Sequence, residues 1–127
     1  MYLDWSLVVI AIDELFHDAI FWLLLMLIIL DFITGTIKAF IMKEVSSSIG
    51  MNGLLKHTTI ILLVVFMGIV TNLSGYAEIK YLFLLFYIFE YVISILENLV
   101  RMGIPFPEQF SRLLRQWKDD NERKWGE

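Results

Sequence analysis

The sequence predicts an all-α integral membrane protein with three transmembrane helices, an N-terminal interfacial helix and a C-terminal cytoplasmic amphipathic helix. Three observations predict this class. The chain has 127 residues, which is one small domain. It is 58% hydrophobic with a mean hydropathy of +0.71, whereas soluble domains are about 45–50% apolar, and so small a chain has too little interior to bury the excess. Its apolar residues also gather into three runs, each close to the length that a helix needs to cross a bilayer.

Residues 1–18 are apolar but repeatedly interrupted by acids. The four acids are Asp4, Asp13, Glu14 and Asp18. The first basic residue is Lys38, and a cleavable export signal needs a basic leader, so we expect the apolar segments to remain as anchors. The acids and the short length favour a helix that lies at the membrane interface, with a fourth span as the alternative.

The three spans are expected at residues 19–42, 57–75 and 79–97. About 20 helical residues cross the hydrocarbon layer, and each run reaches that length only by including polar residues. Residues 43–53 show no apolar periodicity, and their Ser and Gly favour a turn. The connection at 75–78 is much shorter, which predicts that the second and third spans form an antiparallel hairpin.

The tail, residues 98–127, differs from the spans in composition. Gly103 and Pro105 are expected to end the third helix. Apolar residues then recur at i, i+3, i+4 and i+7, which predicts an amphipathic helix: Phe110, Leu113, Leu114 and Trp117. Cations flank that face and are candidates for contact with an anionic inner leaflet: Arg112, Arg115 and Lys118. Packing of the tail on a neighbouring subunit is the alternative.

The distribution of cations predicts the orientation. Lys and Arg collect around the first loop and in the tail, whereas the N-terminal segment has none. Basic residues accumulate on the cytoplasmic side of membranes. Three spans place the first loop and the tail on one side, so we expect the N-terminus outside and the C-terminus in the cytoplasm.

A polar stripe runs along the first span. Asp31, Thr34, Gly35 and Lys38 follow one another at helical spacing, so they share one face. A charge at the bilayer centre costs about 2.5–3.5 kcal/mol, so the stripe should face protein or water. Gly35 would let another helix approach closely. The simpler alternative is that Lys38 extends to the interface and Asp31 is an ordinary, partly buried hydrogen-bonding group.

A second stripe follows the third span, and its polar residues are Glu90, Ser94, Glu97 and Asn98. Together the two stripes supply the candidates for pore lining or helix–helix contact. Glu90 lies deepest and needs a partner, water or protonation. Lys38, Lys56 and His57 are possible partners for the carboxylates on the cytoplasmic side.

The sequence offers no catalytic, cofactor-binding or metal-binding pattern. The chain has no cysteine, which excludes disulfides and thiolate chemistry, and its acids lack the His or Cys spacing of a metal site. Its net charge of −4 argues against nucleic-acid binding. We therefore expect no enzyme and no cofactor. Three helices are too few to enclose a pathway, so the expected partners are the lipid bilayer and further copies of the chain.

Three motifs together resemble the phage holin and toxin-secretion holin-like family of phages and Gram-positive bacteria. They are Asp31-x-x-Thr34-Gly35-x-x-Lys38-Ala39, Ser48-x-Gly50-x-x-Gly53-x-x-Lys56, and Glu97-Asn98 followed by Gly103-Ile104-Pro105-Phe106-Pro107. Each motif is weak alone, but their order on a three-span layout is specific. The resemblance covers residues 19–115.

The resemblance implies a multi-pass homo-oligomer of the bacterial cytoplasmic membrane. Such proteins associate at a critical density and open lesions, through which an endolysin or a toxin leaves as cargo. The alternatives are a small ion channel or transporter subunit, and a non-permeabilising anchor or antiholin.

Overall fold

The computed structural model describes residues 4–105 and 107–125, and every regular element among them is a helix. The elements in chain order are α1 (Trp5–Phe16), α2 (Ala19–Ile41), α3 (Ser47–Leu73), the short 3-10 helix η1 (Ala77–Ile79), α4 (Lys80–Arg101) and α5 (Glu108–Trp125). The predicted all-α class is confirmed.

Three helical segments are long and apolar enough to cross a membrane, as predicted. They are Ala19–Ile41, Ser47–Leu73 and Ala77–Arg101, with mean hydropathies of 2.4, 2.0 and 1.9. At about 1.5 Å of rise per residue, α2 is about 35 Å long, which matches a hydrocarbon layer of about 30 Å.

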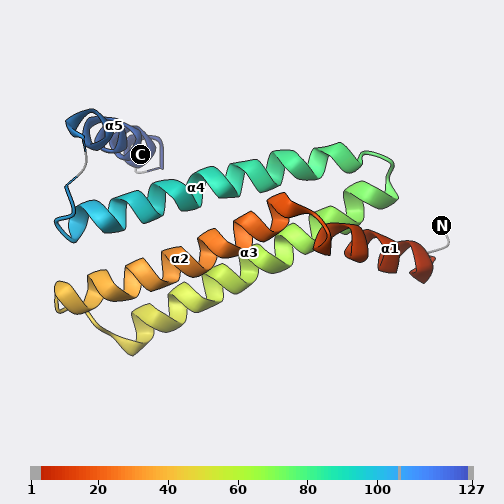
Figure 1. Cartoon of the computed structure of the whole chain (residues 1–127), viewed down its shortest axis with the longest axis horizontal. Coiled ribbons are helices and arrows are strands. Elements are labelled where there is room, and N and C mark those ends of the chain that lie inside the picture. The colour runs from red at the N-terminus through yellow and green to blue at the C-terminus, as the bar shows by residue number, and fades with distance from the viewer. Residues whose placement is uncertain (1–3, 106, 126–127) are drawn as a thin grey trace.

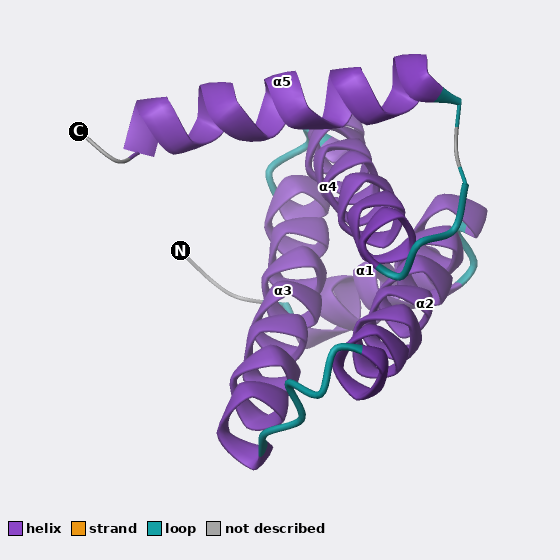
Figure 2. Ribbon diagram, turned by 90° about the vertical axis from the view of Figure 1, so that its left-hand side faces the viewer, coloured by secondary structure: helices purple, strands orange, loops and turns teal. Residues whose placement is uncertain are grey.

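The three long helices alternate in direction, so that α2 and α4 run one way and α3 runs the other way (Figure 1). Helix α2 packs mainly against α4, which runs in the same direction, and less against its chain neighbour α3. We call the end formed by residues 42–46 and the last turn of α4 the tail end, and the end formed by residues 74–79 the hairpin end. Near the tail end, α5 crosses over α4 (Figure 2).

Helix α1 packs against α3 near the hairpin end. Its Ala11 and Leu15 are buried, and a Cβ atom added at Gly68 of α3 would lie 3.4 Å from the Leu15 side chain. Asn72 donates a hydrogen bond to Glu14 over 3.1 Å. Because α1 has 12 residues, fewer than the roughly 17 that cross a bilayer, it is too short to be a fourth span.

Two helix boundaries differ from the sequence expectation. Helix α3 begins at Ser47, so the turn predicted for 43–53 is wrong from that residue onward. Gly50 and Gly53 each cost a helix about 1 kcal/mol, but breaking the helix next to the bilayer would leave backbone groups without partners, which costs more. Helix α4 continues to Arg101, beyond residue 97, because a helix need not stop where the hydrocarbon layer does.

A glycine in the left-handed backbone conformation follows the end of α3 and the end of α4. Gly75 has φ of 83° and Gly103 has φ of 87°, a conformation that glycine adopts without steric cost. The Ile104 N–H donates to the Leu99 carbonyl over 3.1 Å, the bond of a helix-ending Schellman motif. The end predicted for the third helix at Gly103 is thus confirmed.

The buried core is small and draws its residues from α1, α2, α3 and α4. Its largest members are Phe21, Leu24, Leu84 and Leu15. Many large apolar side chains point outward instead, among them Leu82 at 69% exposure and Leu62 at 65%. In water such a surface would aggregate, whereas hydrocarbon solvates it.

Candidate functional site

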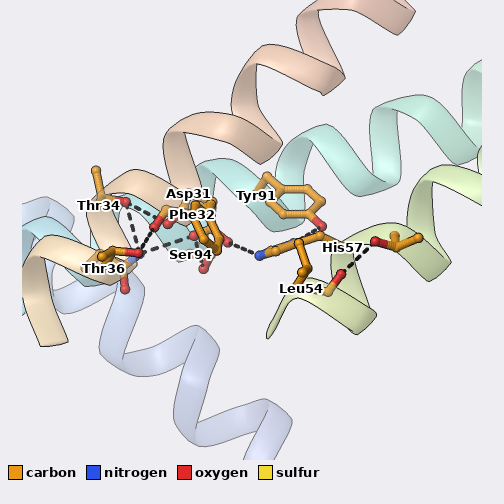
Figure 3. Close-up of polar contacts among 10 residues, drawn as sticks. Asp31, Phe32, Thr34, Thr36, Leu54, His57, Tyr91 and Ser94 are labelled. Atoms are coloured by element: carbon orange, nitrogen blue, oxygen red, sulfur yellow. Dashed lines mark hydrogen bonds and ion pairs between the residues drawn. The ribbon is translucent and has the colours of Figure 1, made fainter. Parts of the chain in front are cut away.

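Asp31 joins the two polar stripes that the sequence places on separate helices. Its Oδ1 accepts a hydrogen bond from Ser94 Oγ at 2.6 Å and another from Asn98 Nδ2 at 3.2 Å. The same Asn98 amide donates to Thr34 Oγ1 over 3.1 Å. Figure 3 shows Asp31, Thr34 and Ser94 of this network between α2 and α4. The structure therefore brings four predicted residues into one network.

Gly35 lets α2 and α4 approach at this network. A Cβ atom at Gly35 would lie 3.6 Å from Asn98 Nδ2, which is ordinary contact. A longer side chain would push the buried amide away from its acceptors. This placement agrees with the close helix approach that the sequence predicts for Gly35.

His57 connects the third helix to the same network. Its Nε2 lies 3.7 Å from Asp31 Oδ2, and its Nδ1 lies 2.8 Å from the Tyr91 hydroxyl. The ring stands between Asp31 and Tyr91 (Figure 3). The sequence offered His57 as one of three possible partners but missed Tyr91. The available signal was spacing, because Tyr91 stands one turn before Ser94 on α4.

We call Asp31, Thr34, His57, Tyr91, Ser94 and Asn98 the midspan cluster. Asp31 lies about 15 Å from the tail end of α2, at 1.5 Å per residue, hence near the middle of this candidate span. The Asp31 and His57 side chains are 11% and 13% exposed. Among the described residues, no buried side-chain nitrogen or oxygen lacks a hydrogen-bond partner. The cluster thus provides hydrogen-bond partners for the Asp31 carboxylate within one copy of the chain.

Several predicted site residues lie outside the midspan cluster, among them Lys38, Glu90 and Glu97 of the two stripes. Lys38 is half-buried and lines a cavity at the tail end. Glu97 accepts a 2.7 Å bond from Lys118 of α5. Glu90 is half-buried at the middle of α4. Of the possible partners for carboxylates, Lys38 and Lys56 form no ion pair among the described residues, whereas His57 faces Asp31.

The ion pair between Lys118 and Glu97 connects α5 to α4. The Glu97 carboxylate accepts the bond and so raises the pKa of Lys118. Arg112 pairs within α5, at 3.1 Å from Glu108, and Arg115 lines the groove between the two helices. Contact of these cations with a leaflet remains a prediction. Phe110 and Leu114, predicted on the apolar face, lie outside the residues whose side chains are described.

The hairpin end holds a second buried charge, which sequence reasoning did not single out as a candidate. Lys80 is 8% exposed, and its Nζ lies 4.0 Å from Asp18 Oδ2 and 5.2 Å from the centre of the Tyr81 ring. Asp18 also caps α2 by accepting from the Ile20 N–H at 2.9 Å. At the N-terminus, the hydroxyl and N–H of Ser6 lower the pKa of Asp4. The charges near this end therefore serve helix starts and helix contacts.

Within residues 4–105 and 107–125 there is no group of three or more His, Cys, Asp or Glu side chains placed to hold a metal ion. The polar groups described above hold helices together. Their chemistry is hydrogen bonding and charge pairing in a medium of low dielectric constant.

Comparisons with known proteins agree with this architecture. The model of the bacteriophage holin family matches residues 8–119. An uncharacterized protein of Clostridium perfringens is 36% identical over 103 residues, covering 80% of this chain and 76% of that one. A probable holin of Bacillus phage phi105 is 33% identical over 103 residues, with the same coverage of 80% and 76%. No solved structure matches.

The family match covers most of the chain, and three helices suit a bilayer. The molecule is a multi-pass membrane protein, and the match supports a holin-like, non-enzymatic role. The chain belongs to the bacteriophage holin family.

Proposed function

We propose that this chain is a holin or holin-like protein that oligomerises in the bacterial cytoplasmic membrane and forms lesions. An endolysin or a toxin would leave the cell through them, leading to lysis or to protein export. The proposed orientation has the N-terminus outside and the C-terminus in the cytoplasm, because Lys and Arg gather at the tail end.

The observation that carries the proposal is the contrast between Glu90 and the other carboxylates of the spans. Asp31 is satisfied by the midspan cluster, and Glu97 pairs with Lys118. Among the described residues, Glu90 has neither a hydrogen-bond partner nor an ion pair, although it stands at the middle of α4. A charge there costs about 2.5–3.5 kcal/mol. A partner from a second copy, or water in a lumen, would remove that cost.

The two carboxylates therefore have different roles in the proposal. The midspan cluster lets a single copy dissolve in lipid with Asp31 buried. Glu90 gains water or a partner only when copies assemble, which removes the cost of holding its carboxyl group in lipid. This difference favours assembly once the protein is dense enough. The apolar faces of the spans contact lipid or neighbouring copies in either state.

The tail would act at the inner leaflet. Arg112, Arg115 and Lys118 are exposed on α5, and Leu113 beside them is 62% exposed. A helix with this mixture of basic and apolar side chains docks on an anionic surface. We assign α5 the role of holding each copy at a fixed depth.

The test compares two variants with the same change of charge, Glu90→Gln and Glu44→Gln. Glu44 is exposed in the loop at the tail end, so its variant is the matched control. Each is expressed with a cytoplasmic endolysin, and lysis time and cross-linked oligomers are recorded. Glu90→Gln should shift lysis time and change the oligomer fraction, while Glu44→Gln should match the wild type. If Glu90→Gln and Asp31→Asn both kept wild-type timing and oligomers, these carboxylates would have no part in the mechanism.

A further inference from the structure

The tail end contains a cavity of 360 Å³ between α2 and α3. Its walls come from the second half of α2, residues 44–46 of the loop and the first turns of α3, and Ser94 and Asn98 of α4 lie at its floor. Figure 1 shows that α2 and α3 diverge toward this end. The cavity extends from the tail end to the midspan cluster.

Two lysines line this cavity without a carboxylate partner. Lys38 is half-buried and Lys56 is exposed, and neither forms an ion pair within the described part of the chain. Two acids also contribute to the lining. Asp31, at the floor, already accepts from Ser94 and Asn98 and faces His57, and Glu44 is exposed at the mouth. The two lysines are therefore the groups available to bind an added anion.

Glycines provide room beside these lysines. Because Asp31 and His57 are in contact, two turns toward the tail end on each helix bring Lys38 level with Gly50. A Cβ atom at Gly50 or at Gly53 would meet nothing within 4 Å. Side chains of α3 tilt toward its N-terminus, so the Lys56 ammonium extends toward the same space.

The rim of the cavity is apolar. Phe32, Phe40 and Ile49 line it and are 45%, 66% and 64% exposed. In a membrane these side chains face acyl chains. A ligand at this place therefore has hydrocarbon on one side and two ammonium groups on the other, which is the chemistry of an anionic lipid.

We propose that this cavity binds the phosphate of an anionic phospholipid between Lys38 and Lys56, with the acyl chains over the apolar rim. The bound lipid would join α2 to α3 where the two helices share few contacts. Lys38 and Lys56 have no role in the assembly mechanism proposed above. The lipid site can therefore be tested independently of the proposed lesion.

The test uses the full chain in phosphatidylcholine vesicles that contain spin-labelled phosphatidylglycerol. Association is measured relative to spin-labelled phosphatidylcholine. A lysine close to an anionic lipid is worth about fivefold in affinity, so Lys38→Gln and Lys56→Gln should each reduce the preference about fivefold. Lys43→Gln is the matched control, because Lys43 lies in the same loop region but does not line the cavity; it should keep the preference.

A second variant separates the cavity from general surface charge. Gly53→Leu fills the space while keeping every charge, and it should remove most of the preference; circular dichroism checks that its helix content is unchanged. The proposal is overturned if Lys43→Gln matches Lys38→Gln, or if a folded Gly53→Leu protein binds as the wild type does. Inorganic phosphate is added in a third arm. Displacement of the labelled lipid by millimolar phosphate would assign the site to a soluble anion instead.

Discussion

Asn98 joins two spans through one amide group, and its replacement by leucine tests that connection. The side chain is 6% exposed, and Nδ2 donates to Asp31 Oδ1 at 3.2 Å and to Thr34 Oγ1 at 3.1 Å. Leucine has a similar volume and no donor. The substitution Asn98→Leu therefore removes two bonds between α2 and α4 and leaves the packing nearly filled.

The expected loss follows from the number of bonds. Hydrogen bonds between transmembrane helices average about 0.6 kcal/mol and reach about 1.7 kcal/mol. Two bonds give about 1.2–3.4 kcal/mol. Asp31 keeps its 2.6 Å bond from Ser94, so its carboxylate is not left alone and the lower part of the range applies. We predict that Asn98→Leu lowers the free energy of unfolding by about 1–2 kcal/mol, near tenfold in the equilibrium constant.

Steric trapping in lipid bicelles measures this free energy. The matched control is Asn52→Leu, because Asn52 is exposed on α3 and makes no side-chain hydrogen bond to another described residue. The control should change stability by less than about 0.5 kcal/mol. Equal values for the two variants would refute the claim that the midspan cluster holds α2 against α4.

Two further predictions concern the outer helices. Gly68→Leu should displace α1, because even a Cβ atom at Gly68 would lie 3.4 Å from the Leu15 side chain of α1. In the Gly68→Leu protein, a cysteine introduced by Ala11→Cys should then react severalfold faster with a thiol reagent than in the wild-type background. An unchanged reaction rate would contradict the packing of α1 on α3. Lys118→Gln should increase the distance between spin labels on α4 and α5, while Arg112→Gln leaves it unchanged. Pairing with Glu97 raises the pKa of Lys118. The pair therefore stabilises the contact between α4 and α5 fully at pH values below the ordinary lysine pKa, and this stabilisation is lost as the pH rises through the raised pKa. An α4–α5 distance that stayed constant through that pH rise would contradict the role of the pair.

The polar stripes were predictable because helical spacing alone defines a face. The positions of Asp31, Thr34 and Gly35 on one helix, and of Ser94 and Asn98 on another, follow from their numbers in the sequence. Their meeting did not follow. It depends on α2 packing against α4, a parallel pair that is not consecutive in the chain, and no local pattern encodes which of two neighbours a helix prefers.

Other features escaped prediction for identifiable physical reasons. Ser and Gly in residues 47–53 favour turns in water. Next to a bilayer, however, backbone N–H and C=O groups are most stable when they are hydrogen-bonded within a helix, and these residues are helical. The burial of Lys80 was not predicted, because it depends on Asp18 at the start of a different helix. Tyr91 was missed because a hydroxyl in an aromatic run gives little polar signal, although it meets His57 at 2.8 Å.

The most direct test of the proposed function is induced expression in a bacterium that carries a soluble cytoplasmic endolysin, with membrane potential and enzyme release followed together. We predict a delay, then an abrupt loss of potential accompanied by release of the folded enzyme. Depolarisation without release would indicate an ion-selective channel or a holin that opens only small lesions. An inserted protein that caused no depolarisation would be an anchor or an antiholin, and that result would contradict the account.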